Sequence, residues 1–145
     1  MTASCIFCRI AEGAIPSHRV YEDDRILAFL DISPIRPGHT QIIPKAHFET
    51  FDEMPADLAA DIVALGQRLA RAMKPLYGVA RVGFAFIGTD VAHVHAHVVP
   101  MVAKTDLTSR RYIVEEEVTF RLPPHPPAEE LQEAAATLHR LLYPA

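Results

Sequence analysis

The sequence predicts an α+β fold, with one antiparallel sheet and helices packed on a face of it. Three observations favour this fold class. Short apolar runs alternate with turn residues in the first half of the chain, as they do in antiparallel strands. Two later segments repeat apolar residues every three or four positions, as amphipathic helices do. Two further runs, rich in β-branched residues and separated by a turn that contains glycine, are typical of a hairpin.

The expected strands are bounded by turn-forming residues. Asp23 and Asp24 separate the first two strands, and the segment from Pro34 to Gly38 separates the second from the third. Gly88 lies between the fourth and the fifth. The five expected strands are Arg19 to Glu22, Arg25 to Asp31, Thr40 to Pro44, Arg81 to Ile87, and Val91 to Met101.

Two helices are expected, each with a single apolar stripe. The first begins at Pro55, which suits a first helical turn, and is closed by Pro75 and Gly78. The second runs from about Ala128 to Leu142. Their apolar stripes consist of Leu58, Ile62, Leu65, Leu69 and Met73 in the first helix, and of Leu131, Ala135, Leu138 and Leu142 in the second.

Length and composition are those of one compact domain spanning residues 1–145. Because 50% of the residues are hydrophobic and 22% are charged, the chain can bury a core without a disulfide framework. Its net charge of −4, without a dense basic patch, argues against a nucleic-acid partner. We find no apolar run that would span a membrane and no secretory signal, so we expect a cytoplasmic protein with no membrane partner.

The most informative segment carries His93, His95 and His97 at alternate positions. On a strand, alternate residues share a face, and the intervening apolar residues pack into the core. One interpretation is a shared metal ion, but the outer two α-carbons would lie about 13 Å apart on a flat strand, so only adjacent histidines could bind one ion. The other interpretation makes His95 a nucleophile or base, supported by its neighbours.

Cys5 and Cys8 are separated by two residues. In a cytoplasmic protein this spacing indicates reduced thiols, a redox pair or a metal knuckle rather than a structural disulfide. The redox interpretation requires the dithiol directly after a strand of a βαβ unit, whereas this pair lies near the N-terminus.

The histidine segment resembles the signature of the histidine-triad (HIT) superfamily of nucleotide hydrolases and transferases, in which three histidines alternate with apolar residues. The motif-bearing core spans about residues 5–101, and residues 102–145 form a C-terminal extension with a helix. Further segments similar to the nucleotide-binding, Hint-like bacterial branch of that superfamily are Cys5 to Ile10, Val20 to Asp24, Leu27 to Pro34, Pro37 to Thr40, and Ile43 to His47.

The resemblance implies a homodimer in which two five-stranded sheets join into one ten-stranded sheet. It also implies that His95 attacks the α-phosphorus of a purine nucleoside phosphoramidate, dinucleoside polyphosphate or related nucleotide, and that water cleaves the covalent nucleotidyl-histidine. His97 and His39 are similar to the residues that position this nucleophile and contact the phosphate. Asp31 aligns with an acid that binds ribose hydroxyls. The remaining nucleotide-binding residues implied are Ile6, Phe7, Ile10, Phe29, Ile32, Gly88 and Thr89.

Bacterial members of that branch carry a structural zinc site, which the resemblance places at Cys5, Cys8, His47 and His93. Two thiolates and two imidazoles are a typical tetrahedral zinc set. With zinc bound there, His93 is structural and unavailable for catalysis.

The chain departs from the family pattern next to the triad. Thr89 stands where Gln is common, Asp90 stands where Ser or Thr is common, and Met101 replaces the usual Arg. Two alternatives to the enzyme therefore stay open: a nucleotide-binding module with little turnover, and an unrelated zinc protein in which the triad belongs to the metal site.

Overall fold

The computed structural model describes residues 4–88, 90–103, 106–107 and 123–143, and it has the predicted α+β architecture. Five strands form one antiparallel sheet in the order β1-β2-β3-β5-β4. The strands are β1 (Arg19–Glu22), β2 (Ile26–Leu30), β3 (Thr40–Pro44), β4 (Arg81–Phe86) and β5 (Ala96–Met101). The helices are α1 (Ile6–Ala11), α2 (Ala56–Tyr77) and α3 (Ala128–Leu142), with a 3-10 turn, η1 (Phe51–Glu53).

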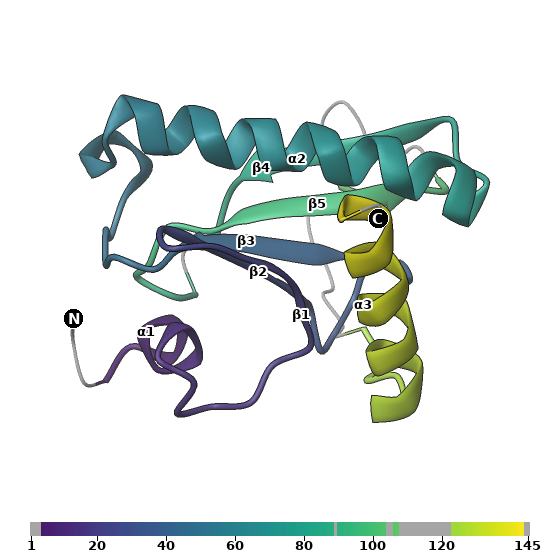
Figure 1. Ribbon diagram of the computed structural model, residues 1–145, viewed down its shortest axis with the longest axis horizontal. Helices are drawn as coiled ribbons and strands as arrows, with labels where there is room; N and C mark the ends of the chain where they lie inside the picture. The colour runs from purple at the N-terminus through teal and green to yellow at the C-terminus, as the bar shows by residue number, and fades with distance from the viewer. Residues whose placement is uncertain (1–3, 89, 104–105, 108–122, 144–145) are drawn as a thin grey trace, which may run out of the picture.

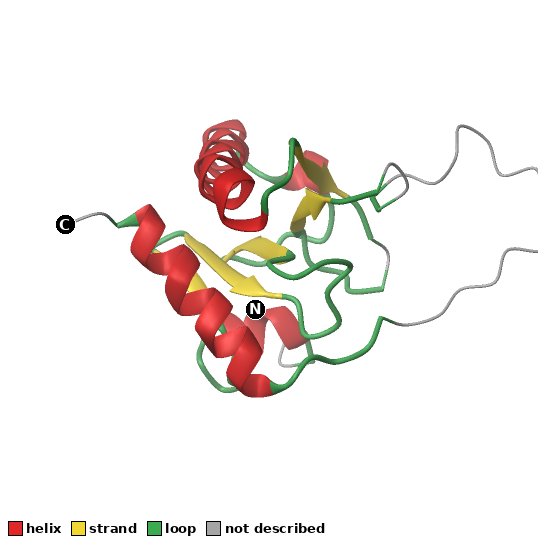
Figure 2. Ribbon diagram, turned by 90° about the vertical axis from the view of Figure 1, so that its right-hand side faces the viewer, coloured by secondary structure: helices red, strands yellow, loops and turns green. Residues whose placement is uncertain are grey.

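Both faces of the sheet are covered, which is why every residue of β2 is buried. Helices α2 and α3 lie on one face and α1 lies on the other (Figure 1). Figure 2 shows α2 nearly end-on above the strands, with α3 running along one side. The main core joins the predicted stripes of α2 and α3 to one face of the strands. A smaller core lies between α1 and the other face and consists of Phe7, Ile10, Leu27, Phe29 and Ile43.

The two predicted helices are confirmed, and all the predicted stripe residues are buried. Pro75 is an exception to the predicted helix end, because it lies inside the last turn of α2 and the helix continues to Tyr77. Gly78 then ends the helix with φ of 62°, a left-handed conformation that glycine adopts without steric cost. Helix α1 and the turn η1 were not predicted.

The prediction of a strand over Val91 to Met101 is wrong in its first half, because β5 begins at Ala96. The backbone bends before it: the His93 amide bonds to the Val91 carbonyl, and the Val94 amide bonds to the Phe48 carbonyl outside the sheet. Of the three alternating histidines, only His97 lies on the strand, so they do not share one flat face. No helix in the described part of the chain is long and apolar enough to cross a membrane.

Candidate functional site

His95 lies just before β5 and is buried, with 8% of its surface exposed. Its Nδ1 is 2.7 Å from the carbonyl oxygen of His93. A carbonyl oxygen only accepts, so Nδ1 carries the proton and the Nε2 of the neutral ring keeps its lone pair. This Nε2 faces Gly88, where an added Cβ would lie only 2.6 Å away. His95 and Gly88 both line a cavity of about 210 Å³.

His39 and His97 form a pair whose proton positions follow from their neighbours. The Ile35 amide donates to Nδ1 of His39 over 3.1 Å, so that nitrogen is unprotonated and the neutral His39 carries its proton on Nε2. Nε2 lies 2.8 Å from Nδ1 of His97 and donates to it. His97 therefore carries its own proton on Nε2, and its ring stands 5.1 Å from that of His95, centroid to centroid.

The buried imidazoles are held in the neutral form. Burial lowers the pKa of His39 to about 4, against an opposing effect of Asp31. Burial also lowers the pKa of His97, and the neighbouring His95 adds to the effect. A neutral histidine pair supplies hydrogen-bond donors and acceptors at pH 7 without a fixed positive charge.

Asp31 follows β2 and is fixed at both carboxylate oxygens. The Ser33 amide donates to Oδ1 over 2.7 Å, and Nε2 of Gln41 donates to Oδ2 over 2.6 Å. Oδ2 also lies 3.8 Å from Nε2 of His39. Asp31, His39 and His97 have ligand-type atoms within 4.8 Å of one another, but these atoms already satisfy each other or Gln41 by hydrogen bonds.

Three of the predicted nucleoside-contacting residues lie together where α1 packs on the sheet. Phe7 packs edge-on against Phe29, with ring centroids 5.8 Å apart, and Ile10 belongs to the same cluster. Phe7 also meets the His95 ring edge-on at 5.2 Å. The apolar cluster of α1 is therefore continuous with the triad.

The remaining predicted nucleotide-binding residues do not belong to this buried cluster. Ile6 and Ile32 are exposed, at 47% and 58%, and Thr89 lies outside the described residues. Gln41 is a residue that the sequence interpretation missed, because it lies in the apolar run that predicted β3. Its polar side chain in the middle of that run was the available signal.

Cys5, Cys8, His47 and His93 come together although they are spread over much of the chain. Sulfur-to-Nδ1 distances are 3.4 Å for Cys5 to His93 and 3.3 Å for Cys8 to His47, and the two Nδ1 atoms are 3.3 Å apart. A tetrahedral ion bonded to sulfur at about 2.3 Å and to nitrogen at about 2.0 Å separates S and N by about 3.5 Å, and two N atoms by about 3.3 Å. These sulfur-to-nitrogen and nitrogen-to-nitrogen distances are therefore those of a tetrahedral zinc site.

The surroundings orient this Cys/His cluster. Nε2 of His93 donates to the Pro44 carbonyl over 2.9 Å, which leaves Nδ1 unprotonated and facing the cysteines. Burial lowers the pKa of His93, so the ring is in the neutral form that binds a metal.

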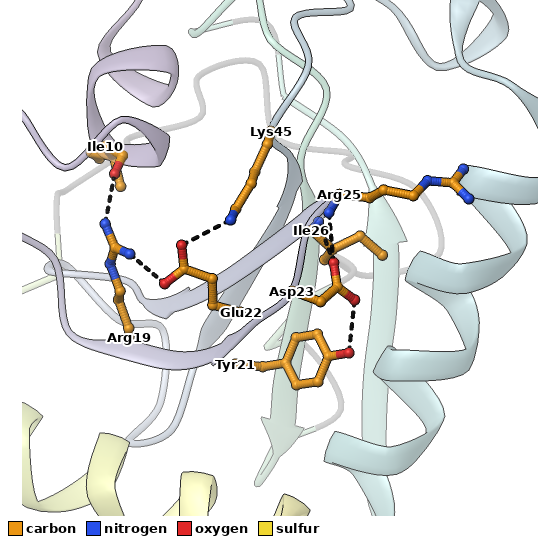
Figure 3. A network of polar contacts seen from close by, with 8 residues as sticks. All are labelled: Ile10, Arg19, Tyr21, Glu22, Asp23, Arg25, Ile26 and Lys45. Atoms are coloured by element: carbon orange, nitrogen blue, oxygen red, sulfur yellow. Dashed lines mark hydrogen bonds and ion pairs between the residues drawn. The ribbon is translucent and has the colours of Figure 1, made fainter.

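A polar network anchors α1, which carries Cys8, to the sheet (Figure 3). Arg19 donates to the Ile10 carbonyl at the end of α1 and pairs with Glu22. Glu22 also pairs with Lys45 over 2.9 Å, and Lys45 directly follows β3. The network thus connects α1 to the segment that leads to His47.

A model of the HIT domain matches residues 12–103 of this chain. The chain belongs to the HIT domain family. An uncharacterized HIT-like protein of Methanocaldococcus jannaschii is 42% identical over 100 residues, covering 66% of this chain and 78% of that protein. The adenosine 5′-monophosphoramidase of Saccharomyces cerevisiae is 39% identical over 101 residues, covering 69% of this chain and 64% of the yeast protein. At the level of the family, the activity is that of a nucleotide hydrolase or transferase.

A solved structure in the family includes a metal. The zinc-bound histidine triad family protein of Mycobacterium smegmatis superposes with a TM-score of 0.71 at 33% identity, covering 96% of this chain and 93% of that one. The match confirms the predicted family and the α+β fold with a five-stranded antiparallel sheet.

Proposed function

We propose that this HIT domain is a nucleotidyl hydrolase or transferase in which Nε2 of His95 attacks the α-phosphorus of a purine nucleotide derivative. The observation that carries the proposal is the bond from Nδ1 of His95 to the His93 carbonyl, because it leaves Nε2 unprotonated beside the cavity at Gly88. A neutral imidazole with a fixed tautomer is a competent nucleophile.

The reaction has two displacements. First, the Nε2 lone pair forms an N–P bond while the bond from phosphorus to the leaving nitrogen or oxygen breaks, and the leaving group takes up a proton. Water then attacks phosphorus, the N–P bond breaks, and the imidazole is regenerated with release of a proton. Purine nucleoside phosphoramidates, dinucleoside polyphosphates and related nucleotides have the required α-phosphorus.

His97 and His39 support this chemistry as a neutral donor pair. His39 donates to Nδ1 of His97, so the donor that His97 offers to a phosphoryl oxygen is its Nε2–H, which must exchange a hydrogen bond to the Ile87 carbonyl for the one to substrate. A preorganised donor of this kind contributes about 3 kcal/mol to transition-state stabilisation. Asp31 accepts hydrogen bonds from the ribose hydroxyls. The nucleoside lies against Ile6, Phe7, Ile10, Phe29 and Ile32, and Gly88 and Thr89 complete the nucleotide site.

Incubation with adenosine 5′-phosphoramidate tests the enzyme. Mass spectrometry of the quenched protein should show an added adenylyl group in the wild type and none in His95→Ala, and ammonia release should fall by more than 10³-fold in the variant. His18→Ala, which removes an imidazole outside the triad, is the matched control. Binding of AMP without turnover or adduct would favour the nucleotide-binding module, which the Thr89 and Asp90 departures allow.

Cys5, Cys8, His47 and His93 would hold a structural zinc ion. The ion would supply four bonds that fasten α1 to the segments before η1 and β5, and no open position for substrate. The tetrahedral spacing of the ligand atoms and the zinc in the mycobacterial relative support this proposal. Such a thiolate set suits the reducing cytoplasm predicted for the protein.

The homodimer is proposed at β4, which forms an edge of the sheet. Apolar side chains gather there: Phe51 is 53% exposed and packs at a tilt against Phe86, with ring centroids 4.8 Å apart, and Ile87 is 52% exposed. Exposed edges with apolar neighbours favour strand pairing between copies. Sedimentation should show a dimer for the wild type and a monomer for Phe51→Glu, whereas a monomeric wild type would contradict the ten-stranded sheet.

A further inference from the structure

Gln41 is a polar residue in the middle of a buried sheet. It is the second residue of β3, paired with Phe29 on one side and His97 on the other. Its side chain lies on the same face as that of its cross-strand partner His97 and donates from Nε2 to Oδ2 of Asp31 over 2.6 Å. This orientation of the amide is required, because the reversed one would place two oxygens against each other.

Stability does not account for this residue. Oε1 of Gln41 is buried and has no hydrogen-bond partner among the described residues. Burying an unpaired polar atom destabilises the folded state, and an apolar residue of similar size would avoid that cost. Ile43, the next β3 residue on the face of Gln41, is fully buried in the apolar cluster with Phe29, so an apolar side chain suits this face. Among the described residues, the Gln41 side chain makes its one hydrogen bond to Asp31.

The contact fixes the plane of the Asp31 carboxylate. Ser33 donates to Oδ1 and Gln41 donates to Oδ2, so each oxygen has one donor and one lone pair remaining. Two remaining lone pairs in a fixed plane match two adjacent hydroxyl groups. Without Gln41, Asp31 would be held at Oδ1 alone and Oδ2 would be free to rotate.

We propose that Gln41 is a positioning residue for sugar recognition: it aligns Asp31 to accept hydrogen bonds from both hydroxyls of a ribose, and it thereby selects ribonucleotides over nucleotides that lack these hydroxyls. The inference rests on the proposed nucleotide site. It adds a residue and a sugar selectivity to that site, and it requires that Gln41→Leu weaken ribose binding without weakening the fold.

Calorimetry with AMP and 2′,3′-dideoxy-AMP tests the inference without relying on turnover. Gln41→Leu should weaken AMP binding about tenfold and dideoxy-AMP binding less than twofold, because only AMP offers hydroxyls to Asp31. The Tm of Gln41→Leu should equal or exceed that of the wild type. Gln67→Leu is the matched control, because it makes the same substitution on the exposed face of α2, and it should change the affinity for neither nucleotide.

The outcomes separate the two proposals. If Gln41→Leu weakens both ligands by the same factor, or lowers the Tm, Gln41 has a structural role and the sugar selectivity is overturned. If the wild type binds neither ligand, the nucleotide site itself is overturned, and the sugar selectivity is overturned with it. A tenfold loss confined to AMP, with an unchanged Tm, is the result that establishes the inference.

Discussion

Replacing Gly88 by alanine should disable the nucleophile. The new Cβ would lie 2.6 Å from Nε2 of His95 and 3.0 Å from Cε1, whereas ordinary contacts between such atoms are about 3.5 Å. The ring or the loop must therefore move by about 0.9 Å, and a misplacement of that size costs about 10²-fold in rate, or about 2.7 kcal/mol in the activation barrier. Steady-state hydrolysis of adenosine 5′-phosphoramidate measures kcat directly.

The backbone of Gly88 complicates the comparison, and Gly78 provides the control. Gly88 has φ of 125°, so alanine there also carries a conformational cost of roughly 1–3 kcal/mol. Gly78 has a positive φ of 62° as well, but an added Cβ there would meet nothing within 4 Å. Gly78→Ala should lower the Tm and leave kcat unchanged. If Gly88→Ala retains kcat within threefold of the wild type, Nε2 does not face Gly88 during the reaction.

Three further predictions concern the supports of the site. Cys8→Ser should lose bound zinc, as measured by elemental analysis. When the metal is in large excess over its Kd, this loss should lower the free energy of unfolding by about 3 kcal/mol. Full zinc occupancy in the variant would refute the ligand set. His39 binds a proton below about pH 6.5 in the unfolded state, whereas its pKa in the folded state is about 4. The free energy of unfolding should therefore fall as the pH drops from about 6.5 to about 4, by about 3 kcal/mol in total. Denaturant titrations of His39→Gln should show a flatter pH dependence, and an unchanged slope would exclude His39 as its source. Gly38→Ala should lower both the Tm and kcat, because its Cβ would lie 2.4 Å from the Tyr77 ring and Gly38 directly precedes His39. An unchanged Tm would show that this ring moves aside at no cost.

The sequence predicted what local periodicity determines. The stripe of α2 from Leu58 to Met73 and the bounds of α3 follow from spacings of three and four residues, which depend only on helix geometry. The residues that the resemblance assigns to the metal site lie together in the structure, and so do His39, His95 and His97, because the family motifs carry information that local periodicity lacks. The Cys/His cluster is an example, because its four residues come from segments far apart in the sequence and lie close together in the structure.

The rest depends on contacts that no local pattern contains. The segment from Val91 to His95 has the alternation of a strand, yet it bends because His93 turns toward Cys5 and Cys8 and because Val94 bonds to Phe48. Helix α1 has only six residues, too few for a periodic signal. The sequence pattern includes Gln41 in an apolar strand, and only the structure shows its hydrogen bond to Asp31.

The bend before β5 connects the Cys/His cluster to His95, which we propose as the nucleophile. Nδ1 of His93 faces the cysteines and its Nε2 donates to the Pro44 carbonyl, while its own carbonyl accepts a hydrogen bond from Nδ1–H of His95. In a regular strand that carbonyl would point along the sheet toward a neighbouring strand, out of reach of a side chain two residues later on the same face. The departure from the strand is therefore what allows His93 to fix the tautomer of His95, and a ligand that holds the ring of His93 also holds the carbonyl on which the nucleophile depends.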